Sequence, residues 1–260
     1  MRAQEHLELL EREINECVAA IANENGHTIS RHFDPDGSQE ILTLQLIAPA
    51  PSLLRWSTMT GEIVSLYRSS LDNAIYALSV NANPAERHDR VAFPVFRHKH
   101  EFEARKKNGA MAVTSGDYKV RQIPDPAKAI VQRVQPFDRT DEAVRTHILW
   151  LLDQLWDIDK HRLPIVAALG ANLISVGTTL ADRTPFMWSA SSRLDVVDGA
   201  EVGRIRFEPG THPQVDVDFQ ATIEVVLRDP PGFEGPLMRN LIECAKFTYS
   251  LIRELSAHFV

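Results

Sequence analysis

The sequence has little cysteine and no long apolar run. Its two cysteines, Cys17 and Cys244, lie near opposite ends of the chain, and we expect both to be reduced. No apolar stretch reaches the roughly 18 residues that a membrane-spanning helix requires. The N-terminal segment MRAQEHLELLEREINE alternates charged and apolar side chains and lacks the apolar core of a signal peptide. We therefore expect a cytoplasmic protein with no membrane partner.

The sequence also lacks the short motifs of several large enzyme classes. It contains no G-x-x-x-x-G-K-[ST], G-x-G-x-x-G, H-E-x-x-H, C-x-x-C or G-x-S-x-G segment. These absences argue against P-loop nucleotide hydrolysis, dinucleotide binding, zincin chemistry and α/β-hydrolase chemistry. The 28 basic and 35 acidic residues give a formal net charge of −7, which does not favour a surface for non-specific phosphate binding. We expect neither a cofactor nor a metal ion.

Hydrophobic periodicity predicts an α+β fold, with an antiparallel sheet and a long central helix pair and terminal helices packed on one face. Apolar residues at helical spacing predict long helices at about residues 3–24, 52–80, 140–162 and 236–259. Alternating patterns predict strands at about residues 28–33, 40–47, 164–176, 193–197, 202–207 and 215–227. Turn residues within 28–47 and 193–207 predict a hairpin in each of these segments.

We expect one α+β domain over residues 1–260. Prolines and short apolar pieces at about residues 81–142 predict a long, partly irregular excursion from this domain. Two short helices are expected within it, near residues 99–107 and 126–134.

Charged residues fall on the apolar faces of the two central helices. Arg68 and Asp72 lie on or beside the apolar stripe of the first, and Asp159 and Arg162 extend the stripe of the second. A buried charge must be paired, because an unpaired one costs roughly several kcal/mol. We therefore predict ion pairs across the helices, from Arg68 to Asp159 and from Asp72 to Arg162 or His161.

This charged network has two interpretations. In the first it only orients the two helices. In the second it forms a polar functional site, since buried titratable groups collect where chemistry occurs. His161 has an imidazole, which ordinarily titrates near neutral pH, and Lys160 adds a cation.

Four ordered segments resemble motifs of a large group of uncharacterised bacterial proteins. Gly61–Asn73 resembles a "G-[DE]-x-x-x-x-L-R-[SN]-[AS]-L-D-H" helix, and Phe93–Phe96 resembles an "FP-[IV]-F" piece. Gln135–Phe137 resembles "QP[YF]", and Leu155–Arg162 resembles an "L-x-x-[IL]-DKHR" helix end. Order and spacing agree from about residue 40 to residue 165. The group has no established activity to carry over to this chain.

Within that group, the "R-[SN]-x-x-x-H" helix is similar to the R-x4-H signature of HEPN domains, α-helical modules that often act as metal-independent ribonucleases. There the Arg stabilises charge on the scissile phosphate and the His moves a proton. Only Arg68 carries over to this chain. The His position is Asn73, which cannot act as an acid or a base, and His161 is the candidate substitute. The β-rich C-terminal half also departs from a plain HEPN bundle.

The resemblance implies an RNA-directed nuclease or nucleotide-handling protein, with RNA as the candidate partner. The candidate catalytic residues are Arg68, Asp72, Asn73, Asp159, Lys160, His161 and Arg162. Two other classes stay open. One is a non-catalytic oligomeric or partner-binding protein, with a homodimer as the candidate assembly and a purely structural network. The other is a small-molecule-binding protein with a pocket bordered by the excursion at about 81–142.

One further cluster bears on metal binding. His98 and His100, with two neighbouring glutamates, carry metal-ligating groups, but on a helix these two histidines would point away from each other. The basic residues between 97 and 107 would also repel a cation. We expect a solvated charged segment there.

Overall fold

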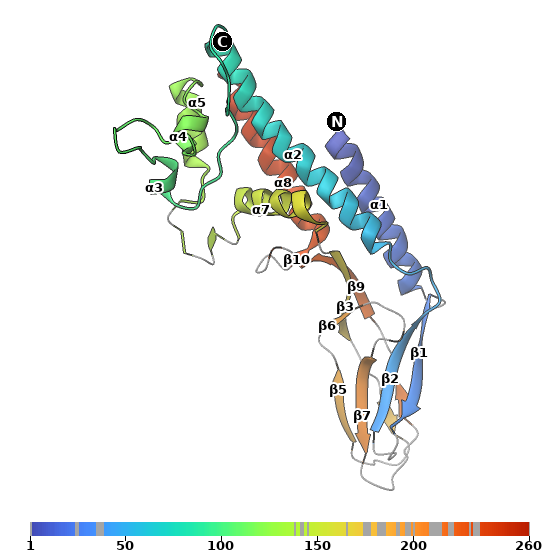
Figure 1. Cartoon of the computed structure of the whole chain (residues 1–260). Coiled ribbons are helices and arrows are strands. Elements are labelled where there is room, and N and C mark those ends of the chain that lie inside the picture. Colours follow the sequence, from blue (N-terminus) through green and yellow to red (C-terminus); the bar gives the residue numbers. More distant parts are fainter. Residues whose placement is uncertain are drawn as a thin grey trace. The chain divides into compact units, whose positions relative to one another are not determined.

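The structure is a computed structural model, and Figure 1 shows its helices and strands. It describes residues 2–23, 26–34, 39–137, 139–140, 143–144, 146–164, 166–173, 178–180, 186–190, 193–195, 199, 201–207, 215–217, 221–228, 230 and 235–259. The chain forms two compact units. Unit 1 comprises Met1–Leu9, Arg55–Ile165 and Leu227–Val260, and unit 2 comprises Leu10–Leu54 and Val166–Val226. That the chain folds as one domain stays a prediction.

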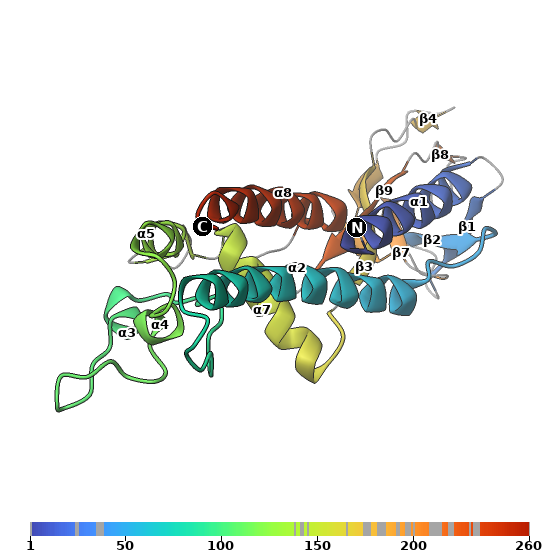
Figure 2. The ribbon, with the colours of Figure 1, turned by 90° about the horizontal axis from the view of Figure 1, so that it is seen from above.

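Long helices dominate unit 1. They are α2 (Leu53–Ala82), α7 (Ile148–His161), α8 (Leu237–Ser256) and the N-terminal part of α1 (Arg2–Ala22). Helices α2 and α8 run side by side, with α7 crossing them (Figure 2). The predicted central helix pair, α2 and α7, is confirmed. A short strand, β10 (Gly235–Pro236), precedes α8.

The apolar stripe of α2 forms much of the core of unit 1. Its predicted members are all buried, and they are Trp56, Ile63, Val64, Tyr67, Leu71, Ile75 and Leu78. On α7, Leu149, Leu151, Leu152 and Leu155 are buried as well. This stripe arises because residues three and four apart share one face of an α-helix, so the apolar positions of α2 all turn toward the same neighbours.

The described residues of the excursion between α2 and α7 include three short helices with defined bounds. They are α3 (Lys99–Phe102), α4 (Gly116–Lys119) and α5 (Asp125–Arg133). The helix predicted near 99–107 ends at Phe102 because the chain turns back at Gly109, whose φ of +80° favours glycine, and an isolated bridge joins Arg105 to Met111. Helix α7 begins at Ile148, later than predicted.

Unit 2 consists mainly of small antiparallel sheets. One has the order β1-β2-β7-β5, with β1 at His27–Phe33, β2 at Gln39–Leu46, β7 at Glu201–Phe207 and β5 at Phe186–Ala190. In another, β3 (Val166–Leu173) lies between β6 (Arg193–Asp195) and β9 (Ala221–Leu227). A third pairs β4 (Thr178–Leu180) with β8 (Val215–Val217). With the helices of unit 1, these sheets confirm the α+β fold class.

The predicted hairpin at 28–47 is confirmed, but the one at 193–207 is wrong. In the first, β1 pairs antiparallel with β2 from His27 opposite Leu46 to Phe33 opposite Glu40, and its turn at 35–38 lies outside the described residues. In the second, β7 pairs with β2 and β5, while β6 pairs with β3. Because both edges of β7 are occupied, β6 has no place beside it.

The long strand predicted at 215–227 is also wrong, since β8 and β9 belong to different sheets. Among the described helices, none is both long enough and apolar enough to cross a membrane.

Candidate functional site

Arg68 is the most deeply buried charged residue that the sequence singled out. It lies in the middle of α2 and is 4% exposed. The apolar residues that surround it in the helical repeat turn its face inward, so the guanidinium leaves water together with them. A buried guanidinium is stable only if its N–H groups find acceptors, and Arg68 has them.

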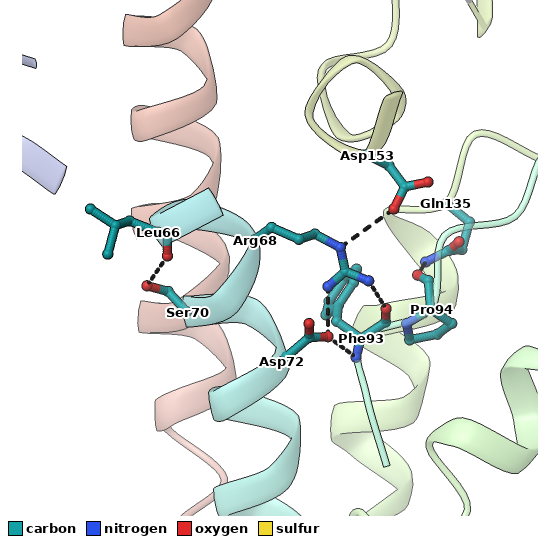
Figure 3. Close-up of polar contacts among 8 residues, drawn as sticks. All are labelled: Leu66, Arg68, Ser70, Asp72, Phe93, Pro94, Gln135 and Asp153. Atoms are coloured by element: carbon teal, nitrogen blue, oxygen red, sulfur yellow. Dashed lines mark hydrogen bonds and ion pairs between the residues drawn. The ribbon is translucent and has the colours of Figure 1, made fainter. Parts of the chain in front are cut away.

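Three acceptors surround the guanidinium (Figure 3). Nη1 donates to Asp72 Oδ1 at 2.6 Å, and Nη2 donates to the carbonyl oxygen of Phe93 at 2.7 Å. Nε donates to Asp153 Oδ1 on α7 at 3.4 Å. Asp72 Oδ1 also accepts the backbone N–H of Phe93 at 2.8 Å. Arg68 and Asp72 together therefore bind both backbone polar groups of Phe93. We call these four residues the Arg68 cluster.

Gln135 continues the same arrangement along the chain. Its side-chain oxygen accepts the backbone N–H of Phe96 at 2.9 Å, and its nitrogen donates to the carbonyl oxygens of Pro94 at 2.8 Å and Val131 at 3.0 Å. Gln135 is 3% exposed. The segment Phe93–Phe96 belongs to no helix or strand, yet side chains satisfy its backbone groups, as burial requires.

Aromatic rings and two lysines border the Arg68 cluster. The guanidinium carbon of Arg68 lies 4.8 Å from the ring centroid of Trp156, and Lys160 Nζ lies 3.0 Å from the same centroid. Lys119 Nζ lies 5.4 Å from the ring centroid of Phe96. Such placements are cation–π contacts.

Burial dominates the electrostatics of the cluster. It raises the pKa of Asp153, although Arg68 and Lys119 favour the carboxylate and oppose this rise. Burial also lowers the pKa of Lys119, and the positive charge of Arg68 lowers it further. Both shifts have the direction expected when charges move out of water without full compensation.

The predicted ion pairs are wrong. Arg68 pairs with Asp72 and Asp153 instead of Asp159, and Asp72 pairs with Arg68 instead of Arg162 or His161. The reason is the crossing of α7 over α2, which brings Asp153 to Arg68. Asp159 lies against Gly61, which precedes Arg68 by about two helical turns.

The close approach of Asp159 depends on the absence of a side chain at Gly61. A β-carbon at Gly61 would overlap Asp159 Oδ1. Burial raises the pKa of Asp159, and the neighbouring Glu62 raises it further. Asp159 also lines a cavity of about 460 Å³ with Glu62, Arg2, His6 and two leucines, in which His6 Nδ1 lies 3.1 Å from Glu62 Oε2.

The remaining candidate catalytic residues are exposed. Asn73 lies on the outer face of α2, and Lys160 and His161 are the last residues of α7. Arg162 is the C-cap residue of α7 and is exposed too, which contradicts its predicted place on the buried stripe. The structure therefore brings Arg68 and Asp72 together, places Asp159 beside Gly61, and leaves the other four exposed, with Lys160 against the ring of Trp156.

Sequence reasoning missed Asp153, Trp156 and Lys119 as parts of the site. A signal existed for Asp153, because Leu149, Asp153 and Trp156 follow i, i+4, i+7 and share one face of α7. Lys119 gave no such signal, since its helix spans only Gly116–Lys119.

His98 and His100 do not point apart as predicted. Their ring centroids lie 5.4 Å apart with an interplanar angle of 22°, a stacked arrangement. The reason is that α3 begins at Lys99, so His98 is an extended N-cap residue instead of a helical one. Among the described residues, no group of three or more His, Cys, Asp or Glu side chains is placed to hold a metal ion.

The hydrogen bonds of Arg68 join α2 to α7 and to the Phe93–Phe96 segment. Each nitrogen of its guanidinium already donates to an acceptor within the protein. Comparison of the chain with protein-family models, with curated proteins and with solved structures finds no match.

Proposed function

We propose that this protein is a non-catalytic binding protein in which the charged network around Arg68 is structural. The observation that carries the proposal is the state of the Arg68 guanidinium, which is 4% exposed and donates from all three of its nitrogens to protein acceptors. An arginine that stabilises a phosphate must present N–H groups to the substrate. Here each nitrogen of the Arg68 guanidinium already donates to a protein acceptor, namely Asp72, Asp153 or the carbonyl oxygen of Phe93.

The placement of the proton-transfer candidates supports the same conclusion. Asn73 and His161 are exposed residues of α2 and α7, whereas Arg68 is buried. A ribonuclease of the HEPN-like kind would need an arginine and an acid–base group at one phosphate. Neither Asn73 nor His161 is among the hydrogen-bond partners of Arg68, which are Asp72, Asp153 and the carbonyl oxygen of Phe93.

The four segments that resemble the bacterial group add support of a different kind. Gly61 of the first lies against Asp159 of the fourth. Arg68 and Asp72 bind Phe93 of the second, and Gln135 of the third binds that segment as well. Motif residues that bind one another have an architectural use, which requires no substrate.

The proposal is tested with labelled structured and single-stranded RNA, incubated with the protein in the presence and absence of EDTA. Wild type, Arg68→Met, His161→Ala and the exposed control Asn73→Ala are compared, and their melting temperatures are recorded. We expect no cleavage by any of them and a lower melting temperature for Arg68→Met alone. EDTA-resistant cleavage that disappears in both Arg68→Met and His161→Ala, with unchanged melting temperatures, would overturn the proposal.

A further inference from the structure

A groove in unit 1 lies where α1, α2 and α8 meet, on residues that the Arg68 cluster does not use. Its volume is about 380 Å³, within the range of about 300–1,000 Å³ that small-molecule sites occupy. The side chains that matter below are Ala3, Tyr67, Ser70, Thr248, Tyr249 and Ile252. We call this the α1–α2–α8 groove. Its walls are mainly apolar, with a few hydroxyl groups, and such a lining is typical of small-molecule sites between helices.

Two hydroxyls of the groove are buried without a hydrogen-bond partner among the described residues. Tyr67 is 8% exposed and Thr248 is 3% exposed, and neither Tyr67 Oη nor Thr248 Oγ1 meets a donor or acceptor there. A buried polar group without a partner costs about 1–3 kcal/mol. Native structures keep few such groups, so two in one groove need an explanation.

Thr248 differs from Thr60 and Ser70 of α2 in its hydrogen bonding, and it shares the lack of a partner with Ser79. A Ser or Thr inside a helix commonly donates to the carbonyl four residues earlier. Thr60 does so to Trp56 at 2.7 Å, and Ser70, in the same groove, does so to Leu66 at 2.8 Å. Thr248 makes no such bond among the described residues, so the helix itself leaves its hydroxyl unsatisfied.

The surroundings restrict the ligand to a neutral molecule. Among the other lining residues, Lys246 donates to Glu243 at 2.9 Å and Gln4 donates to Glu8 at 2.9 Å, so these polar groups already have partners. Burial raises the pKa of Tyr67, so its phenol stays protonated at neutral pH and can donate. Two neutral hydroxyl donors in an apolar groove fit an acceptor oxygen on an otherwise apolar body.

We propose that the α1–α2–α8 groove binds a neutral, mainly apolar small molecule through a carbonyl-type oxygen that accepts from the Tyr67 and Thr248 hydroxyls. This inference names the ligand class for the proposed binding function and rests on it. The apolar walls, among them Ile252 and the ring of Tyr249, hold the body of the molecule.

The test compares two probes of nearly the same shape, acetophenone and α-methylstyrene, which differ in having C=O or C=CH2. Each is titrated into the full-length protein, and Kd is measured from two-dimensional ¹H–¹⁵N NMR spectra. We expect shifts at residues of the groove and an affinity for acetophenone about tenfold higher, the effect of one or two net hydrogen bonds. Equal affinities, or no shifts at groove residues with either probe, would overturn the inference without any variant.

Shape-conserving variants then assign the effect to the two hydroxyls. The double variant Tyr67→Phe/Thr248→Val is expected to bind both probes equally, with the affinity that wild type has for α-methylstyrene. The matched control is Tyr249→Phe, which removes a phenol hydroxyl from a residue that is 73% exposed on the same groove and should keep the tenfold preference. If the double variant still binds acetophenone more tightly than α-methylstyrene, the two hydroxyls are not the source of the preference. RNA cleavage is measured separately, so failure of this inference and failure of the non-catalytic proposal give different results.

Discussion

Tyr67 and Arg68 are consecutive residues of α2, and both are buried, yet their polar groups are in opposite situations. The Arg68 guanidinium has an acceptor at each nitrogen, whereas the Tyr67 hydroxyl has no partner among the described residues. Successive residues of a helix point about 100° apart, so Arg68 points toward α7 and the Phe93–Phe96 segment while Tyr67 lines the α1–α2–α8 groove. The comparison teaches that burial of a polar group does not by itself mark a functional site. Here the satisfied guanidinium holds chain segments together, whereas the unsatisfied hydroxyl belongs to a residue that lines the proposed binding groove.

The largest expected effect comes from removing the satisfied charge. Arg68→Met keeps an apolar stem but leaves Asp72 and Asp153 without their cation and the Phe93 carbonyl without its donor. Breaking a buried pair in this way typically costs about 3–5 kcal/mol. Urea denaturation should show this loss, while the exposed control Asn73→Ala should stay within about 0.5 kcal/mol of wild type. If Arg68→Met lowers the free energy of unfolding by less than about 1 kcal/mol, the hydrogen bonds of Arg68 do not stabilise the fold as proposed.

A smaller effect is expected at the contact between Gly61 and Asp159. Gly61→Ala places a methyl group on Asp159 Oδ1, so the carboxylate must move, and the cost should not exceed the roughly 1–3 kcal/mol of overpacking in a core. Asp159→Ala removes the obstructing carboxylate, so the double variant should be more stable than the sum of the two single effects predicts. Thermal or urea denaturation of the four proteins measures this coupling, and strict additivity would show that the two residues do not touch.

His147, the N-cap residue of α7, should make the stability of the protein depend on pH. Burial, and then the charge of Arg139, lowers the pKa of His147 from 6.5 to about 4. Between these values the unfolded chain binds a proton that the folded chain does not. The contribution of neutral His147 is therefore present above pH 6.5 and is lost as the pH falls toward 4.

Urea midpoints measured from pH 7 to pH 4 should fall more steeply for wild type than for His147→Gln, which cannot titrate. Direct NMR titration of the His147 imidazole provides the second readout. Parallel curves for the two proteins, or an imidazole midpoint near 6.5, would show that burial of His147 does not disfavour its charged form.

The smallest change in stability is expected when the unpartnered hydroxyls of Tyr67 and Thr248 are removed. Tyr67→Phe and Thr248→Val remove hydroxyls that have no protein partner, so in the absence of a ligand each should change the free energy of unfolding by no more than about 0.5 kcal/mol, with stabilisation the expected direction. Differential scanning calorimetry can compare both with wild type. A loss of about 1 kcal/mol or more in either variant would mean that its hydroxyl already has a stabilising partner, and the contrast between Tyr67 and Arg68 would disappear.

The sequence predicted what depends on one helix at a time. The burial of Arg68 and of the whole α2 stripe follows from helical spacing, and both are confirmed. The partner of Arg68 could not be predicted, because it depends on where α7 crosses α2, and a change in crossing point exchanges Asp159 for Asp153.

The same limit applies to the strands and to the groove. Local turn residues predicted that β6 and β7 pair with each other. Pairing is decided instead by competition among strands distant in sequence, and β2 and β5 pair with the two edges of β7. The α1–α2–α8 groove joins Ala3, Tyr67 and Thr248, which are far apart in the chain, so no local pattern could indicate it. The small-molecule hypothesis placed its pocket beside the excursion, whereas the groove proposed above lies between helices.

The Phe93–Phe96 segment has a consequence for the order in which unit 1 folds. Its backbone groups are held by Arg68 and Asp72 of α2 and by Gln135, which follows α5, and Asp153 of α7 holds Arg68 in turn. Closing these chain loops costs entropy before any bond forms to offset it. The segment therefore has no local means of ordering itself and becomes structured only when distant helices have met. A stretch of chain without regular secondary structure thus serves as an indicator of completed assembly.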